Sequence, residues 1–229
     1  MGRQADIMRA RRTSVDEVFE RLYERITTLR LRPGDKISEA EVASEFGVSR
    51  QPVRDAFSRL ANLDLLLIRP QRATLVRRFS LRDIEKSRFV RAAVEAEVLR
   101  RAAGAGNDRD AARLDAILAG QEGAIEARDH ARFGQLDYAF HEELCEIAGT
   151  PFAFEVIAAE KAKVDRLCLL SLEKEDRMPQ LLEDHRRIRE AIVAGDPVRA
   201  VRIGMLHLTR LDSTVEAIAE TNAEYFEPD

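Results

Sequence analysis

The chain has 229 residues, of which 45% are hydrophobic and 34% charged, with a formal net charge of −4. This length and composition are typical of a globular protein with two domains. The sequence contains no run of about 18 apolar residues and no signal-peptide pattern, which excludes a membrane protein and predicts a cytoplasmic location.

Charge is distributed unevenly along the chain. Basic residues outnumber acidic ones in residues 1–82, whereas acidic residues prevail in the remainder. A basic domain beside an acidic one is consistent with a nucleic-acid contact confined to the first part of the chain. Residues 1–12 are basic without periodicity and are predicted to form a flexible N-terminal arm.

Two helices are predicted before residue 47. The first covers about residues 15–31 and ends before Pro33-Gly34. The second begins after Ser38, which forms a capping-box pattern with Glu41, and it ends at Gly47, a typical C-cap residue.

Ser49 to Leu60 is predicted to be an amphipathic helix with a basic N-terminal end. Its apolar positions repeat at helical spacing and leave Arg50, Gln51 and Arg54 off the buried stripe. Arginines in this position can reach guanine edges or phosphates in a major groove. Taken alone, the segment is equally compatible with a solvated basic face. Only Gly47-Val48 separates it from the preceding helix, and this spacing favours a helix-turn-helix.

A β-wing is predicted to follow. Residues 65–69 and 74–78 are strand candidates, and residues 70–73 connect them. Arg72 at the tip of this hairpin suits a phosphate or minor-groove contact. The predicted DNA-binding domain therefore covers residues 13–79.

This region resembles a known family. The runs Leu31-Arg32-Pro33-Gly34-Asp35-Lys36-Ile37 and Gly47-Val48-Ser49-Arg50-Gln51-Pro52-Val53-Arg54 are similar to the winged helix-turn-helix of GntR regulators. Ala40 departs from the arginine that reads a base in some members, and Ala73 replaces the usual wing glycine. The resemblance implies DNA contacts from five side chains: Ser49, Arg50, Gln51, Arg54 and Arg72.

The remainder is predicted to be all-helical, so the fold class is mainly α with a small β wing. Gly or Pro marks most breaks and divides residues 80–222 into a bundle of six or seven helices, followed by a C-terminal tail of residues 223–229. The last helix is predicted to continue through Val215. The sequence has no Gly-rich phosphate loop and no Gly-x-Ser-x-Gly elbow, which argues against the commonest nucleotide-binding and hydrolase folds.

Three of the four histidines lie on apolar helical stripes, where hydrophobic residues would be expected. Asp137 and His141 are four residues apart and project from one face of a helix. A single histidine in such a place is usually a hydrogen-bonded core residue, and this is the alternative for each. His130 lies at a helix start and is excluded. One divalent metal would account for four buried polar groups together: Asp137, His141, His185 and His207.

This second constellation resembles the C-terminal (FCD) domain of the FadR branch of GntR regulators. The matching runs lie between residues 81 and 219: Asp137-Tyr138-Ala139-Phe140-His141, Glu183-Asp184-His185, Gly195-Asp196 and His207. The resemblance implies a divalent ion held by these four ligands, with zinc favoured and nickel or manganese as alternatives. It also implies a carboxylate effector at the open positions of the metal, and it argues against an acyl-CoA effector.

Arg91 shares a helical stripe with Ile84, Val94 and Val98, so its guanidinium is predicted to face the bundle interior. Its fork of donors matches a carboxylate. An internal salt bridge with Glu95 or Asp165 is the alternative. The resemblance favours an effector contact.

The sequence therefore predicts a DNA-binding transcriptional regulator and not an enzyme. We expect a repressor that binds a palindromic double-stranded operator as a homodimer, because a two-fold operator requires two recognition helices. We expect the effector to be a small organic acid or sugar acid. One alternative is a regulator for which the metal itself is the signal, and another is a metal-dependent hydrolase.

Overall fold

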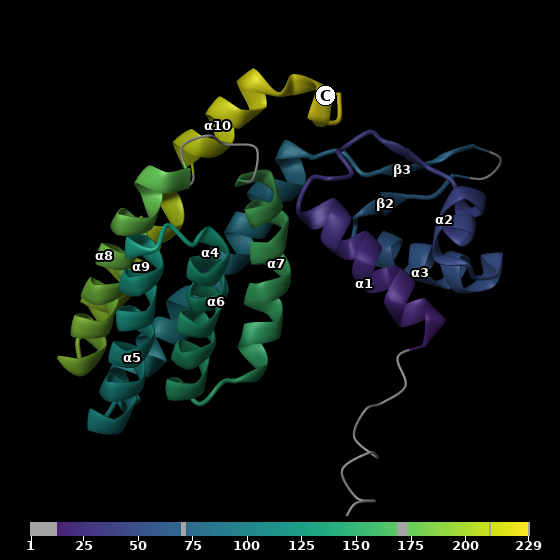
Figure 1. Ribbon diagram of the computed structural model, residues 1–229. Helices are drawn as coiled ribbons and strands as arrows, with labels where there is room; N and C mark the ends of the chain where they lie inside the picture. The colour runs from purple at the N-terminus through teal and green to yellow at the C-terminus, as the bar shows by residue number, and fades with distance from the viewer. Residues whose placement is uncertain (1–12, 70–71, 169–173, 211, 229) are drawn as a thin grey trace, which may run out of the picture. The chain divides into compact units, whose positions relative to one another are not determined.

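The computed structural model describes residues 13–69, 72–168, 174–210 and 212–228 (Figure 1). The chain divides into two compact units, which are Met1–Phe79 together with Glu224–Asp229, and Ser80–Ala223. The predicted arm of residues 1–12 and the two wing-tip positions 70–71 lie outside the described residues.

The first unit combines three helices with a small antiparallel sheet, in which β3 lies between β1 and β2. Its core contains Val18 and Leu22 from the first helix and Phe57 and Leu60 from the third, all fully buried or nearly so. The elements are α1 (Ser14–Thr27), β1 (Lys36–Ile37), α2 (Glu39–Phe46), α3 (Arg50–Asn62), β2 (Leu66–Leu67) and β3 (Thr74–Val76).

The structure differs from the sequence analysis at two places in this unit, one strand that was not predicted and one prediction that was wrong. The strand Lys36–Ile37 was not predicted, although Ile37 pairs with Thr74 across the sheet, because two residues are too short to show an alternating pattern. Ser38 is the N-cap of α2, but its side chain makes no capping hydrogen bond, so the predicted capping box with Glu41 does not form.

The second unit is a helical bundle, as predicted, and the described residues contain seven helices in it. The turns at Gly149 and Gly195 have φ angles of 66° and 63°, in the left-handed region that favours glycine. The helices are α4 (Leu81–Ala105), α5 (Asp108–Glu126), α6 (His130–Ile147), α7 (Phe152–Cys168), α8 (Lys174–Val193), α9 (Pro197–Thr209) and α10 (Asp212–Thr221).

The end of this unit differs from the prediction. The helix of residue His207 does not continue through Val215, because α9 ends at Thr209 and α10 starts at Asp212. Leu211, four residues after His207, lies outside the described residues. Val215 is buried, but it belongs to α10.

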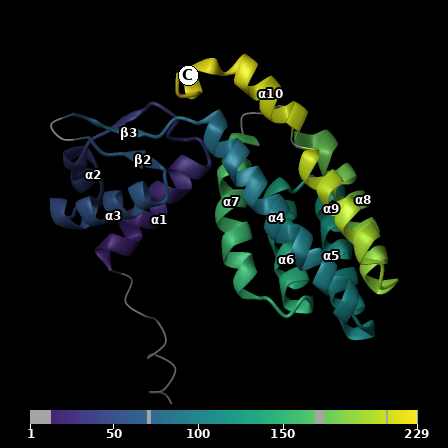
Figure 2. The same ribbon diagram turned by 180° about the vertical axis from the view of Figure 1, so that it is seen from behind.

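The bundle is held by several helix pairs, with α4 packed against α7 and α9 and with α8 against α9 and α5 (Figure 2). Its core is a single cluster that includes Leu99, Leu114, Phe140, Ile157 and Ile188. None of the helices in the described ranges has the length and apolar character that a membrane span requires.

The close approach of α4 and α9 depends on Gly204. A methyl group at this position would lie 2.2 Å from Cδ1 of Leu99, which is buried in the core. We expect Gly204→Ala to destabilise the protein, because overpacking costs ~1–3 kcal/mol and exceeds the helix-propensity gain of ~1 kcal/mol. Gly123→Ala in α5 is the control, since nothing lies within 4 Å of the added methyl group. Thermal unfolding should show a lower Tm for the first variant and not for the second.

Candidate functional site

The helix-turn-helix places a basic helix end at the surface of the first unit. Gly47 ends α2 with a left-handed φ of 63°, and α3 begins three residues later at Arg50. The buried face of α3 fixes the helix in the core and leaves a polar face exposed. The exposed residues include four of the predicted DNA contacts: Ser49, Arg50, Gln51 and Arg54.

The N-terminus of α3 has the properties of an anion-binding position. Its first N–H groups lack helical partners and carry partial positive charge. Ser49 is the N-cap, and its side chain is exposed, so its hydroxyl can donate to a phosphate. Arg72 is also exposed.

Two of the expected DNA contacts are held by carboxylates that the sequence reasoning missed. Nη2 of Arg54 lies 3.3 Å from Oε2 of Glu39 at the start of α2. Nε2 of Gln51 donates to Oδ1 of Asp55 at 2.8 Å. Exposed pairs of this kind contribute little to stability. They do restrict the orientations in which these two side chains can contact DNA.

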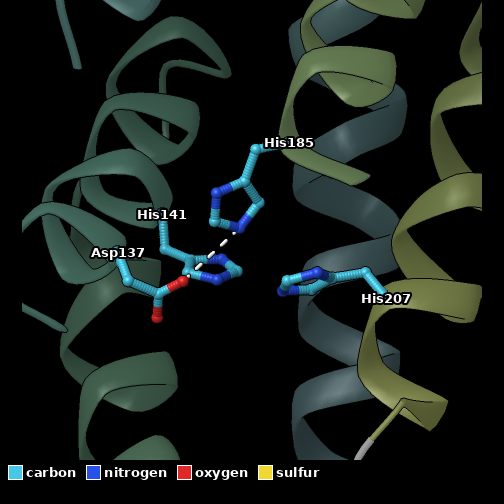
Figure 3. A group of neighbouring side chains, drawn as sticks. All are labelled: Asp137, His141, His185 and His207. Atoms are coloured by element: carbon cyan, nitrogen blue, oxygen red, sulfur yellow. Dashed lines mark ion pairs between the residues drawn. The ribbon is translucent and has the colours of Figure 1, made fainter. Parts of the chain in front are cut away.

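The second cluster of functional side chains lies inside the bundle. Asp137 and His141 come from α6, His185 from α8 and His207 from α9, and all four are buried. Figure 3 shows the four side chains converging from these three helices. Each offers one oxygen or nitrogen atom, and these ligand atoms all lie within 4.8 Å of one another.

Several of the converging atoms have no hydrogen-bond partner. Oδ1 of Asp137, Nε2 of His141 and Nε2 of His185 are buried and unbonded, and the Asp137 and His185 atoms are 3.4 Å apart. Leaving buried polar atoms unsatisfied is costly. A divalent cation bound by a carboxylate oxygen and imidazole nitrogens would satisfy them together, so the residues present fit such an ion.

The opposite edges of these ligands are held by other side chains. Nδ1 of His141 lies 3.1 Å from Oε2 of Glu95, and Nδ1 of His185 lies 3.0 Å from Oε1 of Gln121. Nζ of Lys161 forms an ion pair with Asp137, 2.8 Å from its Oδ2. With Nδ1 of His185 donating to Gln121, Nε2 presents a lone pair toward the cluster, as is usual in metal sites.

Electrostatics favour the metal-binding forms of Asp137 and His185. Burial alone would raise the pKa of Asp137, but the positive charge of Lys161 overcomes this effect and holds that pKa well below its ordinary range. Burial lowers the pKa of His185 well below its ordinary value, and His207 acts in the same direction. The carboxylate is therefore ionised and the imidazole of His185 neutral, which is the combination a divalent cation requires.

A cavity of about 410 Å³ opens beside the cluster. Its lining includes three of the four candidate ligands, the basic residues Arg91, Lys161 and Arg177, and apolar side chains. The apolar part of the lining consists mainly of Phe133, Met178, Leu181 and Leu208. A largely apolar cavity with a few charged groups in its lining is typical of a site for a small molecule.

Arg91 lies in this cavity with one of its donors already used. Its side chain is buried, and Nε donates to Oε1 of Glu95 at 2.8 Å. The internal salt bridge that was the alternative for Arg91 is therefore present with Glu95, whereas Asp165 pairs with Lys161 at 2.6 Å. A guanidinium has five N–H donors, so the bond to Glu95 leaves others available to a ligand.

Glu95 connects Arg91 to the candidate ligand His141. Burial would raise the pKa of Glu95, but His141 and Arg91 lower it to about 2. From the sequence, Glu95 was identified only as a possible partner of Arg91, and Lys161 and Gln121 were not identified. The available signal was a polar residue on an apolar stripe, the same signal that identified the histidines.

Comparison of the sequence with known proteins gives two family matches and several relatives. Residues 14–76 match the family of bacterial regulatory proteins called gntR, and residues 88–210 match the FCD domain. The HTH-type transcriptional repressor RspR of Escherichia coli (strain K12) is 34% identical over 210 residues, which is 92% of each chain. The gluconate operon transcriptional repressor of Bacillus licheniformis is 26% identical, over 80% of this chain and 76% of that protein.

Solved structures show the same fold. McbR/YncC of E. coli superposes with a TM-score of 0.70 at 18% identity, over 90% of this chain and 98% of that one. A transcriptional regulator GntR from Rhodococcus sp. RHA1 superposes with a TM-score of 0.71 at 21% identity, over 89% and 97% of the two chains.

Proposed function

Since the chain belongs to the GntR family of bacterial regulatory proteins and carries an FCD domain, we propose that it is a metal-dependent repressor controlled by a small carboxylate. The family makes it a DNA-binding transcriptional regulator and not an enzyme, so the hydrolase alternative is set aside.

The DNA contact of this proposal uses the exposed end of α3. Arg50 and Arg54 are exposed there and read bases, while Ser49 and the helix N-terminus bind phosphate. Gln51 and, from the wing, Arg72 complete the contact. One chain supplies one recognition helix, so a homodimer binds a palindromic operator in the cytoplasm, where the chromosome is accessible. Repression is supported by the names of two of its relatives.

The observation that carries the metal proposal is the convergence of four buried ligand atoms, three of which have no other partner. Asp137, His141, His185 and His207 would hold one divalent ion per chain. Zinc is favoured because a carboxylate and imidazoles are among its preferred ligands, and nickel or manganese remain alternatives. When bound, the ion supplies a positive charge and Lewis acidity for an anionic ligand.

The cavity supports a small acid as the effector. Its volume of about 410 Å³ lies near the lower end of the usual range for ligand sites and suits an organic acid or a sugar acid. Arg91 and the metal are the two groups that bind the carboxylate. The relative named for a gluconate operon also supports a sugar acid, because gluconate belongs to that class.

A second candidate is a regulator for which the metal itself is the signal. Removing the ion would leave Oδ1 of Asp137 and Nε2 of His141 and His185 buried without partners. The free-energy cost of these unsatisfied polar atoms favours a rearrangement of the metal-free bundle. Operator binding that changes with free metal, at constant acid concentration, would favour this candidate.

The effector proposal is tested with Arg91→Lys. Arg91→Ala is unsuitable, because it would leave Glu95 as a buried charge without its partner. Lysine keeps the charge but loses the planar fork that binds a carboxylate through two bonds. After a thermal-shift screen of organic acids has found a ligand, we expect the variant to need roughly tenfold more acid for half-release of operator DNA, a cost of about 1.4 kcal/mol.

Arg101→Lys is the matched control, because Arg101 lies on the same helix but is exposed and pairs with Glu97. Metal content and operator affinity without acid should stay unchanged in both variants. Wild-type acid dependence in Arg91→Lys would make Arg91 a structural ion pair only.

A further inference from the structure

The chain passes between the two units twice. It leaves the first unit after Phe79, forms the whole bundle, and re-enters the first unit at Glu224. We call Glu224–Pro228 the return segment. Its backbone pairs with the residue at which the chain first leaves, because Phe79 N–H donates to Tyr225 at 2.9 Å and Glu227 N–H donates to Phe79 at 2.7 Å.

Side chains strengthen this pairing. The rings of Phe79 and Phe226 are 5.6 Å apart, and both side chains are buried. Nε of Arg77 lies 3.4 Å from Oε1 of Glu227. Nη1 of Arg32 also lies 3.3 Å from the hydroxyl of Tyr225. The return segment is therefore attached to the first unit by backbone bonds, an aromatic contact and polar side chains.

The N-terminal end of the return segment follows α10, which connects it to the helix that carries His207. His207 lies on α9, and α10 follows α9 after a short break. Nε of Arg210, in that break, donates to Oδ2 of Asp184 at 3.1 Å, which ties it to α8 next to His185. Val215 and Ile218 of α10 are buried, so this helix is packed rather than loose.

We propose that the return segment is a second mechanical tie between the metal-binding helix α9 and the DNA-binding unit. A single peptide connection at Phe79–Ser80 would leave backbone rotations free, and domains joined in that way move independently by default. A second connection, fixed to the same residue by Phe226, removes part of that freedom. A change at His207 then reaches the DNA-binding unit through α10 and the return segment.

This inference rests on the proposed function only for the metal, and its test needs neither operator nor acid. Amide hydrogen exchange of the full chain is measured with and without zinc. In the wild type, zinc should slow exchange in α6, α8 and α9 and also in α1 and α3 of the other unit. In Phe226→Asp, zinc should slow exchange in the bundle alone. Phe226→Leu, which keeps an apolar contact, should behave as the wild type does.

The outcomes separate the two ideas. If zinc slows exchange nowhere, the metal proposal fails and this inference fails with it. If zinc protects the bundle but not α1 and α3 in the wild type, the tie alone is overturned. Protection of α1 and α3 that persists in Phe226→Asp also overturns it. If circular dichroism shows that Phe226→Asp is unfolded, Phe226→Ala takes its place under the same criteria.

Discussion

His185→Ala is expected to reduce the zinc content from about one ion per chain to near zero and to lower the Tm of the zinc-loaded protein strongly. His185 is fully buried, so no surface side chain can take the place of its nitrogen. A ligand at a thousand times its Kd stabilises the folded state by ~4 kcal/mol, and the variant should lose most of this stabilisation. Elemental analysis and thermal unfolding with added zinc measure the two effects.

His130→Ala is the matched control for this prediction. His130 lies in the lining of the same cavity but is not among the four converging ligands. Its replacement should leave zinc content unchanged and the zinc-induced rise in Tm intact. Wild-type protein that contains no metal, when purified without chelators, would return His141, His185 and His207 to the role of ordinary core residues.

Arg50→Ala and Arg54→Ala are each expected to weaken operator binding severely. Loss of one base-reading contact costs ~1–3 kcal/mol, and a homodimer loses the contact in both half-sites. The structure adds that Arg54 is paired with Glu39, so Glu39→Ala should change the preference for bases near Arg54 more than the overall affinity. Fluorescence anisotropy with an operator chosen from random-sequence DNA gives the affinities.

Salt and a charge-matched variant separate specific contacts from general attraction. Wild-type affinity should fall steeply with added salt, because cations are released from the phosphates on binding. Arg30→Ala removes the same charge from an exposed residue outside the helix-turn-helix, where Arg30 pairs with Glu24. It should bind almost normally. Equal losses in Arg30→Ala and Arg50→Ala would contradict the assignment of α3 as the recognition helix.

The sequence was sufficient for the parts of the fold that depend on local signals. Gly149 and Gly195 mark turns because the left-handed backbone there favours glycine. The helical faces of the bundle followed from apolar repeats. The strand Lys36–Ile37 could not be predicted in the same way, since it is defined by its pairing with β3 and not by its own residues.

The residues of the candidate site also fall into those that local sequence signals identify and those that depend on how the helices pack. Asp137 and His141 share one helix face, and this spacing is visible in the sequence. Lys161 and Gln121 come from other helices, and their contacts with Asp137 and His185 depend on how those helices pack. The return segment was assigned to a tail for the same reason, because the partner of Phe226 lies far away in the sequence at Phe79.

The position of Glu95 couples the binding of the acid to the binding of the metal ion. Its carboxylate contacts both Arg91 and His141, so the proposed acid site and the proposed metal site share one charged group. An acid that binds Arg91 weakens the ion pair between Arg91 and Glu95. The carboxylate of Glu95 then interacts more strongly with His141 and makes that imidazole a stronger electron donor to the ion. Linkage then requires the acid and the ion to raise each other's affinity by the same factor. On the proposed function, the regulator is a coincidence detector, whose output reports that metal and acid are abundant at the same time.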